Sequence, residues 1–188
     1  MIFMKKHLFT GMKSAQRAIF SIATALILCT APSAHAHGDP NDATTISAQD
    51  WVTWGEVVHG GFGSHIALGI RIGEDALKRL GAKRRDVEVT VTEGAKAPCA
   101  CVADGITLAT AASAGQRSLT VLPKSTDESF MAVIEIRKKK SDKAVTYRIP
   151  ASAQAPLGNM NIGKSAAERF ALVMNAPESS LYNISEKK

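Results

Sequence analysis

The sequence predicts an α+β domain in which N-terminal helices pack on a mostly antiparallel sheet and a C-terminal helix follows. Helical patterns come first, between residues 48 and 80. Segments with strand character fill the middle of the chain, and an amphipathic helix follows at 165–175. Strands that are grouped after helices favour α+β over a doubly wound sheet, in which helices and strands would alternate.

Two helices are expected at the start of the domain. Ser47 can cap a helix over 48–58, which has Asp50 in its first turn. The glycines at 60, 61 and 63 break this helix. A second helix is expected from Ser64 to Leu80, where apolar residues recur at helical spacing, and Gly81 ends it.

Gly69 and Gly73 lie four residues apart on the second helix and leave a smooth strip on its surface. Each glycine costs about 1 kcal/mol in a helix relative to alanine. The strip therefore predicts that another backbone comes close. This backbone belongs either to the same domain or to a second copy in a homodimer, and we favour packing within the domain.

The remaining elements follow from residue periodicity and turn residues. Residues 87–91 alternate with period two, which is typical of a strand. A short helix is expected at about 102–109, and the capped amphipathic helix at 165–175 is followed by a turn. The other expected strands are 118–122, 130–137, 144–149 and, at an edge of the sheet, 181–184.

Residues 1–36 have the layout of a secretory signal peptide. A basic start without acidic residues precedes the apolar run Ala18–Leu28, which is too short to span a bilayer. Ala34 and Ala36 supply the small residues of a cleavage site. We expect cleavage after Ala36, a periplasmic or secreted protein, and no membrane association afterwards. The alternatives are a lipoprotein attached through Cys29 and an uncleaved anchor.

The expected mature chain has a flexible arm at 37–45 and one domain at 46–188. The leader holds four of the 23 Lys and Arg residues and none of the 17 Asp and Glu residues. The expected mature chain therefore has 19 basic residues against 17 acidic ones. The basic balance of the whole chain therefore comes mostly from the leader. It gives no reason to expect a nucleic-acid partner.

Cys99 and Cys101 are the cysteines of the mature chain. In an oxidising compartment two cysteines usually pair, but a separation of one residue makes a small ring. Three interpretations stay open: soft-metal ligands, a redox pair, and small buried apolar residues. No serine-hydrolase elbow, phosphate-binding loop or dinucleotide fingerprint is present, so binding is expected rather than catalysis.

Three motifs resemble the E-subunit family of formylmethanofuran dehydrogenase over residues 51–184. The first is the turn 59–64, followed by Gly69, Arg71 and Gly73. The second is 101–107, in place of the family's Cys-x-x-Asp-Gly-Ile-Gln. The third is 110–116, in place of its Thr-Gly-Cys-Thr-x-Gly-Lys. The resemblance implies the family's fold and a polar pocket in which some members hold a metal.

Several polar residues of that family pattern are replaced in this chain. The replacements are Gly61 for a histidine, Ala112 for a cysteine, Gln116 for a lysine and Thr107 for a glutamine. Losing a nitrogen ligand, a sulfur ligand and a cation together indicates that the inherited pocket is either vestigial or remodelled for another ligand.

The resemblance leaves His59, Cys101 and Asp104 of the family pocket, and His65 and Cys99 are additions. Together they predict a metal site of imidazole, thiolate and carboxylate groups, which suits zinc or copper. By the same resemblance, small-ligand contacts are expected at Arg71, Thr110 and Gln116.

Two other cofactor sites are compatible with the sequence, a copper site at the expected N-terminus and a haem pocket. Cleavage after Ala36 would leave His37 with an amine and an imidazole that can chelate copper. A non-covalent haem pocket would need axial ligands among His59, His65, Met131 and Met160, although no Cys-x-x-Cys-His motif is present.

The function predicted from the sequence is an exported, non-catalytic binding module for a metal ion or metal cofactor. The alternatives are a thiol or metal redox protein that uses Cys99 and Cys101, and a partner subunit with a vestigial pocket.

Overall fold

The computed structural model describes residues 46–187. The predicted signal peptide, the arm at 37–45 and the copper-binding terminus at His37 lie outside the described residues. The helices are α1 (Ala48–His59), α2 (Ser64–Leu80), α3 (Cys101–Thr110), α4 (Gln154–Asn159) and α5 (Ala166–Asn175). The strands are β1 (Val87–Glu93), β2 (Leu119–Val121), β3 (Phe130–Lys138), β4 (Ala144–Pro150) and β5 (Asn183–Lys187).

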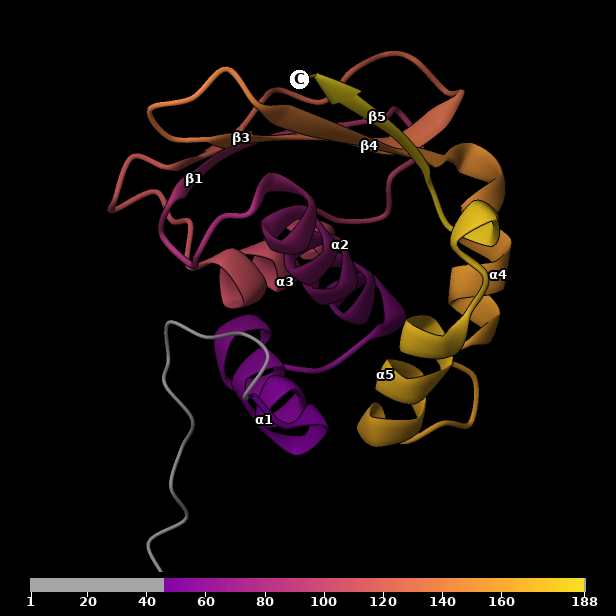
Figure 1. Ribbon diagram of the computed structural model, residues 1–188. Coiled ribbons are helices and arrows are strands. Elements are labelled where there is room, and N and C mark those ends of the chain that lie inside the picture. The colour runs from indigo at the N-terminus through magenta and orange to yellow at the C-terminus, as the bar shows by residue number, and fades with distance from the viewer. Residues whose placement is uncertain (1–45, 188) are drawn as a thin grey trace, which may run out of the picture. The chain divides into compact units, whose positions relative to one another are not determined.

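The five strands form one sheet in the order β2-β1-β3-β4-β5, in which only the β1–β2 pair is parallel. Figure 1 shows α2 and α3 beneath one face of this sheet, with α1 and α5 on the far side of α2. Strand β1 alternates buried and exposed residues at its start, as expected for a sheet with one covered face. The predicted α+β class is confirmed.

Local sequence signals explain where the helices begin and end. The Ser47 side chain accepts a hydrogen bond from the Asp50 backbone N–H at the start of α1. Gly81 adopts the left-handed conformation that ends α2, with φ of 53°. At α5, Ser165 and Glu168 form a reciprocal capping box. The bounds expected for α2 agree with the structure.

Two regions near the C-terminus differ from the prediction. Helix α4, preceded by the 3-10 turn Ala151–Ala153, has no predicted counterpart, because Pro156 and Gly158 mask its short apolar pattern. Strand β5 begins at Asn183 rather than at 181. Leu181 and Tyr182 are almost completely buried, so these apolar side chains anchor the chain in the core before the strand starts.

The glycine strip of α2 packs against α3 within the same chain. A Cβ atom at Gly69 would collide with the Val102 carbonyl and with the backbone of Gly105, and one at Gly73 would collide with Ala109. The expectation of close packing inside the domain is confirmed. The strip is therefore not free to form the homodimer contact that we considered as its alternative.

Within residues 46–187, no helix combines the length and the apolar character needed to cross a membrane.

Glu74 on α2 provides a prediction about stability and pH. Burial raises the pKa of Glu74 to about 7, although a hydrogen bond from the Trp51 indole acts in the opposite direction. A raised pKa in the folded state favours folding at low pH, and this contribution is lost as pH rises from about 4.5 to 7. Glu74→Gln should therefore stabilise the protein by ~1–2 kcal/mol at pH 8, a figure reduced because the carboxyl is only partly buried.

The measurement for Glu74→Gln is urea unfolding at pH 5 and pH 8, followed by Trp fluorescence. The gain in unfolding free energy should fall at pH 5 to about a quarter of its value at pH 8, because the folded-state carboxyl is then protonated and the unfolded-state carboxyl is partly ionised. The matched control is Glu56→Gln, at an exposed position of α1, which should change stability little at either pH. An equal gain in unfolding free energy for Glu74→Gln at pH 5 and pH 8 would contradict the raised pKa of Glu74.

Candidate functional site

The candidate site forms where α1 turns into α2. Helix α1 ends at His59, and Gly60 follows with φ of 83°, a left-handed conformation that favours glycine. The Gly60 N–H donates to the Glu56 carbonyl at 2.9 Å and so caps the helix. This sharp turn places His59 and His65 on either side of the glycine segment.

A cavity of about 360 Å³ opens beside this turn, and we call it the glycine-turn pocket. It is lined by His59, Gly60, Gly61, Phe62, Gly63, His65, Ile66, Cys101, Asn161 and Arg169. The lining comes from the α1–α2 turn, the first residue of α3, the loop after α4, and α5. Segments more than one hundred residues apart therefore meet around one hollow.

His59 and Asp104 form a polar pair next to this pocket. The His59 Nδ1 lies 2.7 Å from the Asp104 Oδ2, and both side chains are partly exposed. An exposed pair of this kind adds little to stability, so its main consequence is orientation. When the neutral imidazole donates from Nδ1, Nε2 keeps a free lone pair.

His65 has a buried ring nitrogen with no hydrogen-bond partner within residues 46–187, namely Nε2. Burial lowers the pKa of His65, so the ring is neutral at pH 7. His65 also lines a second, much smaller cavity of about 10 Å³, which we call the inner cavity. Buried polar atoms are nearly always satisfied, so this nitrogen indicates a ligand or water position.

The side of the pocket formed by the loop after α4 is held by a hydrogen-bond network. The completely buried Ser64 hydroxyl donates to the Leu157 carbonyl, and the Ser64 N–H donates to the Asn161 Oδ1. Arg169 on α5 donates to the Phe62 carbonyl at 2.8 Å, while its Nε is buried without a partner in the described chain. These contacts join the start of α2 to the loop after α4 and to α5.

Cys99 and Cys101 form a disulfide, with their Cα atoms 5.3 Å apart. Cys101 lines the glycine-turn pocket and Cys99 lines the inner cavity. Cys99 is exposed, so the interpretation of both cysteines as buried apolar residues is wrong. Because the sulfurs are bonded to each other, they are not thiolate ligands in this state.

The three expected small-ligand residues lie away from the glycine-turn pocket. Arg71 donates two hydrogen bonds to the carbonyls of Val173 and Ala176, which fixes the end of α5. Thr110 is completely buried, and its hydroxyl donates to the Ile106 carbonyl. Gln116 is exposed and binds Arg85. Each of the three residues is engaged by its own surroundings, and the expectation of small-ligand contacts at them stays a prediction.

The residues expected as metal or haem ligands lie in different parts of the structure. Within residues 46–187, no group of three or more His, Cys, Asp or Glu side chains could hold a metal ion. Met131 lines the inner cavity, and Met160 lines a separate groove beside α5. No His–Met axial pair for haem is therefore assembled around the glycine-turn pocket in the described part of the chain.

Four residues around the two cavities are absent from the sequence-based site. Phe62, Asn161 and Arg169 line the glycine-turn pocket, and Glu93 lines the inner cavity with one carboxyl oxygen buried and unpartnered in the described chain. Only Phe62 carries a sequence signal, as a lone aromatic residue within a glycine turn. The others reach the site through tertiary packing.

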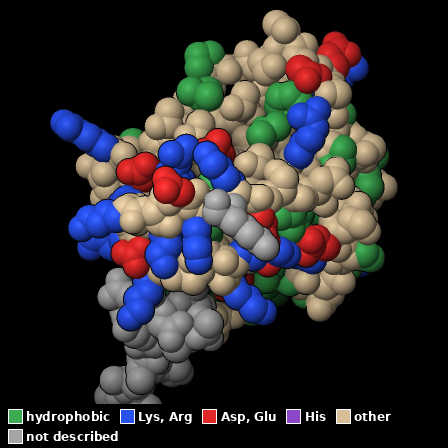
Figure 2. Space-filling view, turned by 45° about the horizontal axis from the view of Figure 1, so that its top comes forward, with side chains coloured by type: hydrophobic (Ala, Val, Ile, Leu, Met, Phe, Trp, Pro, Cys, Tyr) green, Lys and Arg blue, Asp and Glu red, His purple; other side chains and the backbone are tan. Residues whose placement is uncertain are grey.

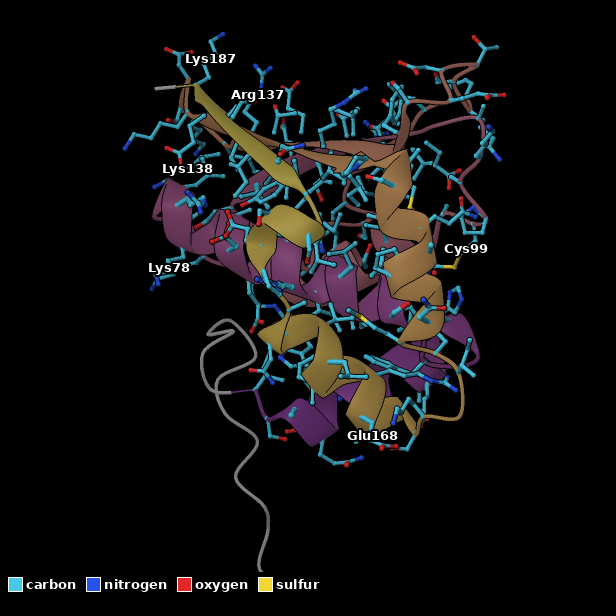
Figure 3. The ribbon with its side chains drawn as sticks, turned by 90° about the vertical axis from the view of Figure 1, so that its right-hand side faces the viewer. Lys78, Cys99, Arg137, Lys138, Glu168 and Lys187 are labelled. Atoms are coloured by element: carbon cyan, nitrogen blue, oxygen red, sulfur yellow. A yellow bond between two sulfur atoms is a disulfide. The ribbon has the colours of Figure 1, made fainter. Side chains whose placement is uncertain are left out.

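Charged side chains mark other parts of the surface. On the face in Figure 2, Lys and Arg side chains gather on one side with Asp and Glu residues among them. In Figure 3, Lys78, Lys138 and Lys187 lie on the opposite side of the molecule from Cys99. The basic side chains labelled there therefore lie away from the candidate site.

Residues 58–183 match the family model described as FmdE, Molybdenum formylmethanofuran dehydrogenase operon. The match covers His59, His65, the disulfide and α5. It confirms the family resemblance that the sequence motifs predicted. No curated protein matched the chain.

Proposed function

The chain belongs to the FmdE family, and from this premise we propose that it is a non-catalytic binding module that holds a metal ion or metal cofactor in its glycine-turn pocket. The family description names a molybdenum enzyme operon, and the proposal takes from the family only the fold and the pocket. His59 and His65 are the proposed metal ligands. Asp104 is a positioning residue for His59.

The observation that carries this proposal is the buried, unpartnered Nε2 of His65, a residue that lines the pocket. Leaving a buried polar atom unsatisfied costs about 1–3 kcal/mol. Coordination to a metal would recover this cost. Burial also keeps the imidazole neutral, which is the form that binds metals.

The His59–Asp104 pair supports the same conclusion. Metal-ligating histidines commonly donate their other ring N–H to a carboxylate, which fixes the tautomer and the ring orientation. The 2.7 Å contact from Nδ1 to Asp104 has this form and leaves Nε2 of His59 as the ligand atom.

Two imidazoles do not complete a metal's coordination shell. The described residues hold no larger His, Cys, Asp and Glu cluster, and the two sulfurs are bonded to each other. The remaining positions would be taken by water or by the ligands of a cofactor, as in open sites rather than closed structural ones. Imidazole ligands suit zinc and copper.

The proposal places the protein outside the cytoplasm. The signal-peptide pattern of residues 1–36 supports export, and so does the disulfide, because such bonds persist in oxidising compartments. Export is tested by intact-mass measurement of protein from the periplasm, which should give the mass of residues 37–188.

The metal site is tested by calorimetric titration of the exported chain with Zn²⁺ and Cu²⁺. A His37→Ala background removes the competing chelate at the expected N-terminus. We expect one metal per chain, and binding at least ~100-fold weaker in His59→Ala and in His65→Ala. Asp104→Asn should weaken binding by roughly 10–100-fold, because it alters only the partner of a ligand.

The matched control for Asp104→Asn is Asp86→Asn, which removes an exposed carboxylate outside the glycine-turn pocket and should leave metal affinity unchanged. If the chain binds neither metal, or if both histidine variants bind as tightly as their parent, the metal proposal is wrong. The chain would then be better explained as a partner subunit with a vestigial pocket.

A further inference from the structure

The Cys99–Cys101 disulfide contributes little to holding the fold together. It connects residues only two positions apart, so it links no distant segments. The stabilisation expected from a disulfide grows with the loop that it closes and reaches about 3 kcal/mol for a 15-residue loop. A one-residue loop falls well below this value, so a role other than stabilisation needs to be considered.

The two sulfurs occupy different surroundings. Cys99 is exposed and lies at the edge of the molecule in Figure 3, where a thiol from outside can approach it. Cys101 is partly buried and is the first residue of α3, a ten-residue helix whose N-terminus has no side-chain cap. The positive end of a helix stabilises negative charge on a sulfur at this position.

Asp104 is the acidic residue in the first turn of α3 and would oppose negative charge on Cys101. Its carboxylate is engaged by His59 at 2.7 Å, which reduces this opposition. Cys99 is therefore the accessible sulfur for attack, and Cys101 is the better leaving group.

The inner cavity favours the reduced form of the pair. Glu93 has a buried carboxyl oxygen that lacks a hydrogen-bond partner in the described chain, and it lines this small cavity together with Cys99. The disulfide has no S–H group to donate. Reduction creates an S–H donor at Cys99, and this donor can satisfy the Glu93 oxygen. A hydrogen bond gained only on reduction makes a disulfide more oxidising.

We propose that Cys99–Cys101 is a redox-active disulfide that oxidises dithiols of exported proteins. A partner thiolate attacks the Cys99 sulfur and forms a mixed disulfide, while the Cys99–Cys101 bond breaks and Cys101 leaves as a thiolate that takes up a proton. The partner's second thiol, as its thiolate, then displaces Cys99. The partner ends as a disulfide and this chain as a dithiol, so two electrons and two protons are transferred to it. This activity goes beyond the proposed metal binding.

The test uses the full chain after export, kept metal-free with a chelator so that the metal proposal does not affect the result. A synthetic peptide with two reduced cysteines is the substrate, and alkylation followed by mass spectrometry counts free thiols. We expect one peptide disulfide for each protein disulfide consumed, in native buffer. A disulfide that is reduced only after denaturation would overturn the proposal.

Two cysteine variants test the direction of attack. In Cys101→Ser, Cys99 is first converted to a mixed disulfide with thionitrobenzoate, and the reduced peptide should then attack the Cys99 sulfur and release thionitrobenzoate. The same displacement at Cys101 in Cys99→Ser should be at least tenfold slower, because Cys101 is partly buried whereas Cys99 is exposed. Equal rates, with circular dichroism matching the parent chain in both variants, would contradict the assigned roles.

Glu93→Ala tests the role of the inner cavity. Equilibration of the native disulfide with glutathione buffers should show about a tenfold loss in the equilibrium constant for reduction, which corresponds to about 30 mV. The control is Glu88→Ala, an exposed residue on the same strand, which should leave the constant unchanged. An unchanged constant in Glu93→Ala would remove Glu93 from the proposal.

Discussion

Gly69→Ala should destabilise the protein by about 3 kcal/mol or more. The added methyl group would collide with the Val102 carbonyl and the Gly105 backbone of α3. Overpacking usually costs about 1–3 kcal/mol, and backbone atoms cannot move aside as a flexible side chain can. The gain of about 1 kcal/mol in helix propensity offsets only part of this cost. The measurement is urea unfolding followed by the fluorescence of Trp51, which is 2% exposed.

Gly158→Ala is the matched control for Gly69→Ala. Gly158 also lies in a helix, but a Cβ atom there would have no neighbour within 4 Å. This control should therefore be neutral or stabilise the protein by up to about 1 kcal/mol. If Gly69→Ala unfolded within about 0.5 kcal/mol of the parent chain, the close packing of α2 on α3 would be wrong.

Phe62→Ala should cost about 3–5 kcal/mol, the range typical of a buried phenylalanine. The ring is 4% exposed, and its centroid lies 6.1 Å from that of Phe170. A Cβ atom at Gly55 would collide with this ring, which shows how closely α1 packs against it. The variant would therefore leave a cavity in the lining of the glycine-turn pocket.

Thermal and urea unfolding measure the effect of Phe62→Ala, and Ile162→Ala is the control. Ile162 is 73% exposed, so its truncation should change the unfolding free energy by less than about 0.5 kcal/mol. Similar losses for both variants would contradict the burial of the Phe62 ring. Since Phe62 lines the proposed ligand site, Phe62→Ala should also weaken Zn²⁺ binding.

The packing of α2 connects these stability predictions to the site. Close contact at Gly69 and Gly105 positions α3, and the first turn of α3 carries Cys101 and Asp104. An outward shift of α3 would separate Asp104 from His59. A stability variant in this interface, such as Gly69→Ala, is therefore also expected to weaken metal binding.

The fold class and most element bounds followed from the sequence, because the signals are local. Caps such as Ser47 and Ser165, and the left-handed glycine at 81, depend on residues within one turn. The glycine strip on α2 also predicted a closely packed backbone correctly. Helix α4 was missed, since Pro156 and Gly158 are weak signals for a helix that tertiary packing stabilises.

The candidate site depended much more on tertiary structure. The family resemblance, with His65 and Cys99 as additions, selected His59, Cys101 and Asp104 as one predicted metal site. It could not determine that Asp104 binds His59 across 45 positions of the chain, or that Arg71, Thr110 and Gln116 are engaged elsewhere. Arg169 and Glu93 carried no sequence signal, because their places at the cavities come from α5 and β1 packing on α2 and α3.

The sequence by itself determined the order of the elements, the close approach at Gly69, the turn between the two histidines, and the family. These features depend on periodicity, helix caps and motifs, which are formed by residues close together in the sequence. Only the tertiary structure decided which polar atoms are satisfied. Whether the Nε2 of His65 has a partner depends on residues brought near it from distant parts of the chain. Because this buried nitrogen has no partner within residues 46–187, it indicates a position for a ligand.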